Sequence, residues 1–199
     1  MRIGIYGGTF SPPHMGHFHA VSAFLAQEKP DRMLIIPACV PPHKLLSGDA
    51  TPENRMEMCR LAFAELSSVT VSDMEIRRGG KSYTVLTLRE LACDEDTSIL
   101  LCGADMFLSL DTWYCAPEIF RLAEIVYAER QNNAEQARLS VKANFYRTRY
   151  GATVRPLAFT PVEISSSILR TSVAKGEDTT RYLNPKVRRY IDQCHLYRK

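Results

Sequence analysis

The chain has 199 residues, of which 45% are hydrophobic and 24% charged, a composition typical of a folded globular protein with a sizeable core. The formal net charge is only +3, without long runs of one sign, which argues against nucleic acid or an anionic membrane as a partner. No segment has the length of a signal sequence or of a membrane span of about 18 apolar residues, so we expect a cytoplasmic protein.

Apolar segments of strand length alternate along the chain with longer segments of helical periodicity. The predicted strands are Arg2–Tyr6, Arg32–Pro37, Ser98–Cys102, Glu124–Ala128 and Thr153–Leu157. The predicted helices are one that begins near Gly16, then Glu53–Leu66, Tyr83–Ala92, Asn133–Tyr150, and one that opens at Asn184-Pro185. This alternation predicts an α/β fold, a mostly parallel sheet with helices on both faces. We expect one domain over residues 1–199 with a small helical part from about residue 164.

The first predicted strand runs into a turn with two glycines and two histidines. Its sequence is Gly7-Gly8-Thr9-Phe10-Ser11-Pro12-Pro13-His14-Met15-Gly16-His17. A turn from a parallel strand into a helix presents backbone N–H groups and the positive end of a helix dipole to an anion. His14 and His17, wholly or partly protonated, would donate to an α-phosphate and stabilise charge as pyrophosphate leaves. Taken alone, the turn is equally consistent with an ordinary helix cap.

A second segment with phosphate-binding character lies near the other end of the chain. It reads Ile164-Ser165-Ser166-Ser167-Ile168-Leu169-Arg170. Its hydroxyls are expected at a helix N-terminus with Arg170 one turn in, an arrangement that suits β- and γ-phosphates. A serine-rich cap beside a solvated arginine is the ordinary alternative.

Three further strings are candidates for contacts with the substrates. Lys44 follows the second strand on a proline-rich loop, Ala38–Pro52, where it could reach a phosphate, and Arg55 in the next helix could assist. Ser82-Tyr83-Thr84 opens a helix whose N–H groups suit an anion. Gly103 and Asp105 follow a central strand, and Trp113-Tyr114 offer an aromatic platform. A solvated lysine, a plain helix cap and a core tryptophan are the respective alternatives.

Taken together, these strings resemble the motifs of the nicotinate mononucleotide adenylyltransferases, in the nucleotidyltransferase superfamily. The first resembles Gly-Gly-Thr-Phe-Asp-Pro-x-His-x-Gly-His and the second Ile-Ser-Ser-Thr-x-Ile-Arg. The others resemble the Pro-Pro-His-Lys, Ser-Tyr-Thr, Gly-x-Asp and Thr-Trp-Tyr strings of the same family. The resemblance spans the chain in order, from Gly7 to Arg170, with Ser11 in place of the usual Asp.

The resemblance implies a Rossmann-like fold and the transfer of the adenylyl group of ATP to nicotinate mononucleotide in NAD biosynthesis. It implies catalytic roles for His14, His17, Lys44 and Arg170. It implies ATP contacts at Gly7, Gly8, Thr9, Phe10, His17, Gly103, Asp105, Ile164, Ser165 and Ser166. It implies acceptor contacts at Lys44, Ser82, Tyr83, Thr84, Trp113 and Tyr114. Mg²⁺ is expected as the cofactor, bound mainly through the ATP phosphates, with no dedicated protein metal site.

Two alternative hypotheses about the function remain open. One is a sister enzyme on the same fold that adenylylates phosphopantetheine or nicotinamide mononucleotide. The other is a nucleotide-binding module that has lost turnover, for which Ser11 is the only support and against which the intact His14, His17, Lys44 and Arg170 stand. A large gain in rate in Ser11→Asp would indicate such a weakened site. The sequence also leaves open whether the chain forms a homo-oligomer.

Overall fold

The computed structural model describes residues 1–42, 50–93, 95–129, 133–158, 160, 162 and 164–198. Within these residues one six-stranded sheet has the order β3-β2-β1-β4-β5-β6. The strands are β1 (Arg2–Gly8), β2 (Arg32–Pro37), β3 (Val69–Val71), β4 (Thr97–Cys102), β5 (Ala123–Ala128) and β6 (Val154–Leu157). The pairs β1–β4, β4–β5 and β5–β6 are parallel, which confirms the predicted α/β class.

The described chain divides into two compact units. Unit 1 consists of residues 1–6, 20–34 and 83–161, and unit 2 of residues 7–19, 35–82 and 162–199. Strands β1 and β2 and helix α1 (Met15–Glu28) contribute residues to both units. The expected single domain with a helical C-terminal part stays a prediction.

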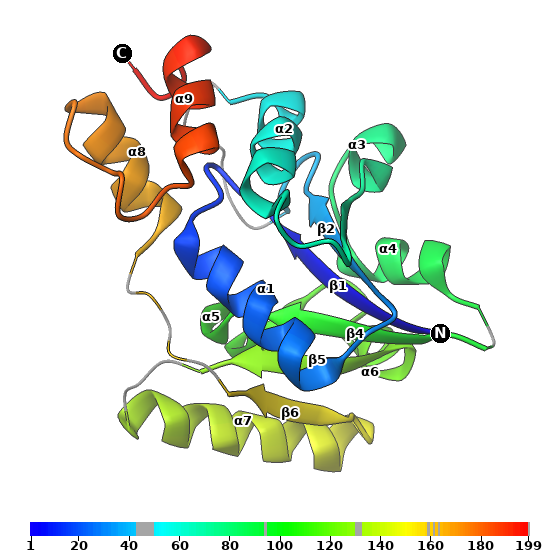
Figure 1. The fold of residues 1–199 in the computed structure, drawn as a ribbon. Coiled ribbons are helices and arrows are strands. Elements are labelled where there is room, and N and C mark those ends of the chain that lie inside the picture. Colours follow the sequence, from blue (N-terminus) through cyan, green and yellow to red (C-terminus); the bar gives the residue numbers. More distant parts are fainter. Residues whose placement is uncertain are drawn as a thin grey trace. The chain divides into compact units, whose positions relative to one another are not determined.

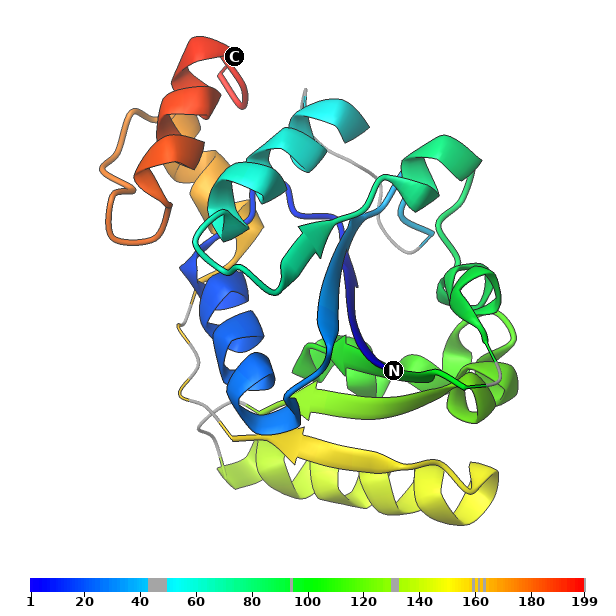
Figure 2. The same ribbon diagram turned by 45° about the vertical axis from the view of Figure 1, so that its right-hand side comes forward.

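Unit 1 contains strands β4 to β6 and the helical segments between residues 84 and 150. Its helices are α4 (Thr84–Leu91), α5 (Ala104–Leu108), the 3-10 turn η1 (Leu110–Thr112), α6 (Ala116–Leu122) and α7 (Asn133–Tyr150). Helix α7 packs along β6 (Figures 1 and 2). The ring of Tyr146 is fully buried, and its hydroxyl donates to the carbonyl of Phe107 at 2.7 Å, so α7 is also tied to α5.

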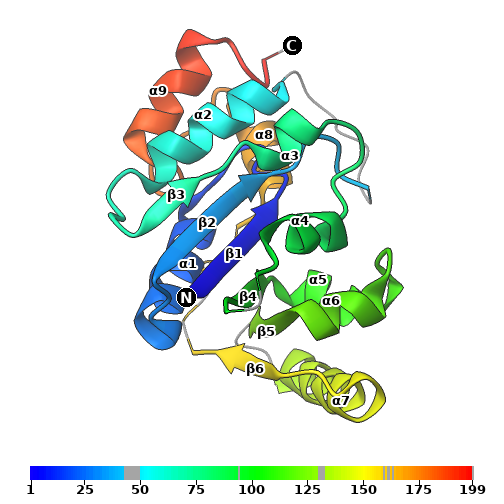
Figure 3. The ribbon, with the colours of Figure 1, turned by 90° about the vertical axis from the view of Figure 1, so that its right-hand side faces the viewer.

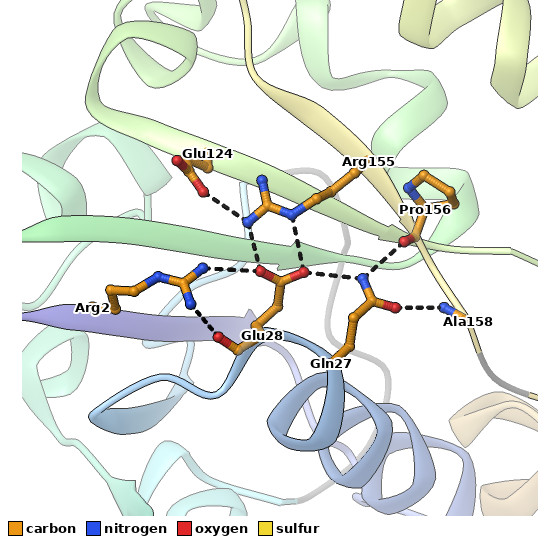
Figure 4. Close-up of polar contacts among 7 residues, drawn as sticks. All are labelled: Arg2, Gln27, Glu28, Glu124, Arg155, Pro156 and Ala158. Atoms are coloured by element: carbon orange, nitrogen blue, oxygen red, sulfur yellow. Dashed lines mark hydrogen bonds and ion pairs between the residues drawn. The ribbon is translucent and has the colours of Figure 1, made fainter.

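A network of charged side chains joins α1, β5 and β6 within unit 1 (Figure 4). Glu28 at the end of α1 is only 4% exposed, and one of its oxygens lies 2.5 Å from the guanidinium of Arg155. The same guanidinium contacts Glu124 at 2.7 Å, and Arg2 contacts Glu28 from β1 at 3.2 Å. Hydrogen bonding to Arg155 lowers the pKa of the Glu28 carboxyl. The network therefore keeps Glu28 ionised although it is buried.

Unit 2 contains strand β3 and helices α2 (Pro52–Phe63), α3 (Met74–Arg78), α8 (Ser166–Ala174) and α9 (Pro185–Gln193). Helix α2 begins with a capping box in which Thr51 and Asn54 exchange hydrogen bonds. Figure 3 shows α2 and α9 side by side, and the amide of Asn54 donates to the hydroxyl of Tyr190 at 3.0 Å. None of the helices in the described parts of the chain is long and apolar enough to cross a membrane.

The predicted elements with strong periodicity are present, and several have the expected bounds. Strand β2 and helix α7 begin and end where predicted, and the remaining predicted strands shift at their ends by two residues or fewer. Gly151 has φ 63°, as expected of a left-handed helix cap, and Asn184 caps α9 ahead of Pro185. The sequence reading missed β3, α3, α5 and α6, which are too short to show a hydrophobic period.

Candidate active site

The loop after β1 folds over a buried aromatic ring. Phe10 has φ 49°, a region that side chains other than glycine rarely adopt, and is only 2% exposed. Its ring packs edge-on against His17 and Phe63, at centroid distances of 5.1 and 6.4 Å. A Cβ on Gly8 would lie 3.0 Å from this ring, a tight contact that favours glycine there. The ring of Phe10 is therefore a packing element of this loop.

The two histidines of the first motif lie against each other where α1 begins. Their ring centroids are 3.8 Å apart, and the backbone N–H of His14 donates to Nδ1 of His17 at 3.1 Å. The side chain of His14 is buried, and its Nδ1 has no hydrogen-bond partner in the part of the chain that the structure describes. Burial lowers the pKa of the His14 imidazole to about 4. In the free protein the His14 imidazole is therefore neutral at neutral pH.

Gly16 makes room for this pair. A Cβ at position 16 would lie 3.0 Å from both Cε1 and Nδ1 of His14. A side chain at position 16 would therefore require the His14 ring to shift by a few tenths of an ångström, which favours glycine in this first helical turn despite its low helical propensity.

The second motif lies against the same loop. Ser165 caps α8 by accepting from the N–H of Ile168 at 3.3 Å, and the hydroxyl of Ser166 donates to the carbonyl of Pro12 at 2.9 Å. The guanidinium of Arg170 donates to the carbonyl of Ser11 at 2.8 Å. Ile164 is half-buried just ahead of the helix. The structure thus brings together the two motifs that the sequence singled out as phosphate-binding.

Ser11, which replaces the family's usual Asp, has a partner in this fold. Its hydroxyl lies 3.0 Å from the hydroxyl of Tyr197, near the end of the chain, and both residues are buried. The side chain that departs from the family pattern is therefore hydrogen-bonded and does not leave a gap in the loop.

The candidate acceptor residues divide between the two units. In unit 1, Tyr83 and Tyr114 lie in contact, with ring centroids 4.8 Å apart, and Tyr114 is 53% exposed. Thr84 is the first residue of α4, and no side chain caps that helix. In unit 2, the hydroxyl of Ser82 accepts from the N–H of Cys39 at 2.8 Å. Ser82 therefore fixes the segment after β2 and does not cap α4 as the plain-cap alternative required.

The remaining candidates of unit 1 follow β4. Gly103 is the N-cap of α5, and a Cβ there would meet no atom within 4 Å. Asp105 is exposed in the first turn of α5, and Trp113 is half-buried at the end of η1. This setting agrees with the partly exposed position expected for Trp113.

Two basic residues, Lys44 and Arg55, were also expected near a phosphate. Lys44 lies outside the described residues. Arg55 is 0% exposed, because its guanidinium lies inside unit 2 and donates to the carbonyls of Thr9 and Cys39 at 2.9 and 3.0 Å. In the free protein, Arg55 has no exposed surface with which to contact a phosphate, and its expected assistance at the phosphate stays a prediction.

The donor set around the first motif is cationic or neutral. In the described part of the chain, no three His, Cys, Asp or Glu side chains are grouped so that they could hold a metal ion. Imidazole, hydroxyl and guanidinium groups suit phosphate oxygens, whereas Mg²⁺ prefers carboxylate and other oxygen ligands.

Comparison with known proteins places this geometry in a family. Residues 5–172 match the cytidylyltransferase-like family. The chain is 37% identical to a protein of Geotalea daltonii named "Probable nicotinate-nucleotide adenylyltransferase", over 99% of this chain and 98% of that protein. A protein of the same name from Chromobacterium violaceum is 34% identical over 99% of both chains. The chain belongs to the nicotinate-nucleotide adenylyltransferase family.

A solved structure agrees with this family assignment at the level of the fold. The Plasmodium falciparum nicotinic acid mononucleotide adenylyltransferase, complexed with NaAD, superimposes with a TM-score of 0.75. The match covers 98% of this chain and 97% of that one, at 17% identity. The family member described here therefore has the Rossmann-like nucleotidyltransferase fold that its motifs implied.

Proposed function

We propose that this protein transfers the adenylyl group of ATP to nicotinate mononucleotide, giving nicotinate adenine dinucleotide and pyrophosphate. The observation that carries the proposal is the His14–His17 pair, with ring centroids 3.8 Å apart, at the start of α1. In a chain of this family, two imidazoles beside a helix N-terminus form a site for a phosphoryl group.

In the proposed reaction, the 5′-phosphate of the mononucleotide attacks the α-phosphorus of ATP in line. The new P–O bond forms as the bond to pyrophosphate breaks, and no covalent enzyme intermediate is needed because a phosphate is already a competent nucleophile. Catalysis then consists of positioning both substrates and stabilising charge on the α-phosphate and the leaving pyrophosphate.

The residues of unit 2 supply the phosphate contacts. His14 and His17 donate to the α-phosphate, and the backbone of Gly7 to Phe10 lines the turn. Ile164, Ser165, Ser166 and Arg170 serve the β- and γ-phosphates. His14 is neutral in the free protein, so it donates through its single N–H, and a bound triphosphate raises its pKa by bringing negative charge close to it. Lys44 is assigned to the phosphates by family resemblance alone.

The residues of unit 1 are proposed to recognise the two nucleosides. Thr84 and the N–H groups at the start of α4 receive the carboxylate of the pyridine ring, an anion that nicotinamide lacks. Trp113, Tyr83 and Tyr114 stack on that ring. Asp105 binds the adenosine ribose. Ser82 acts in unit 2 by holding the segment after β2, since its hydroxyl is engaged by Cys39.

Mg²⁺ is proposed as the cofactor, held mainly by the ATP phosphates because the described residues offer donors for anions around the first motif. When bound, it neutralises phosphate charge. The protein is further proposed to act in the cytoplasm. A homo-oligomer remains a hypothesis that sedimentation would test.

The direct test supplies Mg-ATP together with nicotinate mononucleotide, nicotinamide mononucleotide or phosphopantetheine, and follows the release of pyrophosphate. A reaction without acceptor corrects for hydrolysis of ATP. We expect release largely confined to nicotinate mononucleotide. Release with another acceptor would identify a sister enzyme, and no release with any of the three would favour a nucleotide-binding module without turnover.

A further inference from the structure

Arg55 occupies a position that is unfavourable for a cation in three respects. Its side chain is 0% exposed, and an ionised group loses its hydration when it is buried. It lies in the first turn of α2, where the helix dipole disfavours positive charge. Its Nε has no hydrogen-bond partner among the described residues. Burial accordingly lowers the pKa of the Arg55 guanidinium.

No carboxylate among the described residues forms an ion pair with Arg55. The partners of its guanidinium are two backbone carbonyls, that of Thr9 at 2.9 Å and that of Cys39 at 3.0 Å. Thr9 belongs to the loop that carries His14, and Cys39 belongs to the segment that follows β2. One planar side chain therefore joins the two loops that follow neighbouring strands.

The rest of the loop after β1 is held from other directions. Arg170 donates to the carbonyl of Ser11, Ser166 donates to the carbonyl of Pro12, and Tyr197 pairs with the hydroxyl of Ser11. Arg55 contacts both this loop and the segment after β2, which the N–H of Ala38 also joins to the end of β1 by a hydrogen bond to the carbonyl of Gly8 at 2.9 Å. Loss of Arg55 would therefore remove side-chain contacts from two loops at once.

We propose that Arg55 is a positioning residue that fixes the loop carrying His14 against the segment after β2, and so sets the alignment of the two substrates for adenylyl transfer. This inference rests on the proposed function. Arg55 has no exposed surface, so it acts through the carbonyls of Thr9 and Cys39 and touches neither substrate.

The inference predicts a loss of turnover with little loss of substrate affinity. A displacement of about 1 Å between reacting groups can lower a rate by about a hundredfold, while each substrate keeps its own contacts. Lysine keeps the charge but lacks the planar fork that reaches two carbonyls. We therefore expect kcat to fall by about 10- to 100-fold in Arg55→Lys, and KM for each substrate to stay within about threefold.

The experiment compares Arg55→Lys, Arg55→Gln and Arg55→Met with the parent protein and with Arg60→Met. Arg60 is an exposed residue of the same helix whose partner is Glu57, so Arg60→Met is the matched control and should keep parental kcat. The number of competent sites in each sample is counted by calorimetric titration with Mg²⁺ and a nonhydrolysable ATP analogue, and kcat is expressed per site. Circular dichroism and thermal unfolding report the folded state.

The kcat per competent site decides the inference. A folded Arg55→Lys protein with kcat within twofold of the parent would overturn it, as would a loss that disappears once sites are counted. If all three variants fail to fold, the arginine serves the fold and the inference is rejected. Failure of the proposed function is seen separately, because the parent protein would then release no pyrophosphate with nicotinate mononucleotide. In that case the variant-to-parent ratio is measured with whichever acceptor the parent uses.

Discussion

Two arginines of this chain are used in opposite ways. In unit 1, Arg155 lies between the carboxylates of Glu28 and Glu124, at 2.5 and 2.7 Å, and hydrogen bonding to Glu28 raises its pKa. In unit 2, Arg55 is more deeply buried but contacts only carbonyl oxygens. At Arg155, which has no proposed contact with a substrate, two carboxylates neutralise the charge of the guanidinium. At Arg55, in the unit where the phosphates are proposed to bind, the described residues supply no carboxylate partner. The guanidinium instead holds two loops through their backbone carbonyl groups.

The largest effect on turnover is expected from removing a proposed phosphate-binding group in unit 2. Replacing His17 with Ala removes one preorganised donor to the α-phosphate, so turnover should fall by roughly a hundredfold or more while KM for the acceptor changes little. Steady-state kinetics with the pyrophosphate assay measure both parameters. His19→Ala is the control, since His19 is exposed on the same helix. Unchanged turnover in His17→Ala would remove His17 from the mechanism.

Removing Arg155 from the charge network of unit 1 should lower stability and leave turnover unchanged. Arg155→Met leaves Glu28, which is 4% exposed, with only Arg2 as a cationic partner. We expect the free energy of unfolding in urea to fall by about 2 to 3 kcal/mol, below the range for fully buried pairs because Arg155 is 30% exposed. Turnover per folded molecule should stay within twofold. A loss of turnover comparable with that of His17→Ala would show that the two regions are not separable in this way.

The pH dependence of the free energy of unfolding tests the burial of His14 in unit 2. Because the folded pKa of His14 is about 4 and the unfolded value is near 6.5, the unfolded state binds more protons between these values. As far as His14 is concerned, the free energy of unfolding therefore keeps its full value above pH 6.5 and falls as the pH is lowered toward 4. We expect a loss of about 2 kcal/mol, after allowing for relaxation of the surroundings.

The measurement for His14 is urea unfolding at pH 7, 5.5 and 4.5 in the parent protein and in His14→Gln. The difference between the two proteins removes the effect of carboxylates such as Glu28, whose lowered pKa acts in both. The parent should lose stability relative to His14→Gln as the pH falls. A constant difference would mean that His14 is not desolvated in the free protein.

The smallest effect is expected from Gly16→Ala. Alanine favours the helix by about 1 kcal/mol, but its Cβ would lie 3.0 Å from the imidazole of His14. We expect turnover to fall about tenfold, an effect near 1.4 kcal/mol on the barrier, with the unfolding midpoint unchanged or raised. Ser22→Ala in the same helix is the control. Parental turnover in Gly16→Ala would show that the His14 ring tolerates displacement.

The sequence predicted those parts of the site that depend on local spacing. His14 and His17 are three residues apart at a helix start, and Ser165 caps a helix one turn ahead of Arg170, so periodicity and capping rules place them. The contacts of Arg55 and the pairing of Ser11 with Tyr197 join residues that are distant along the chain. No local rule brings such residues together.

The fold shows the same division between local and long-range information. Strand β2 and helix α7 were predicted to the residue because local signals mark their ends, Pro37 in the strand and Gly151 after the helix. Glu28 is only 4% exposed at the end of α1, and no sequence pattern singled it out. Its burial depends on Arg155, more than a hundred residues away, and so only the structure shows it.

The most direct test of the proposed activity is a competition between equal concentrations of nicotinate mononucleotide and nicotinamide mononucleotide for limiting Mg-ATP. The ratio of the two dinucleotide products, measured by mass spectrometry, equals the ratio of the two kcat/KM values at equal acceptor concentrations. Our account predicts that nicotinate adenine dinucleotide predominates, because a helix N-terminus is proposed to receive the carboxylate. A predominance of NAD, or the formation of neither dinucleotide, would contradict it.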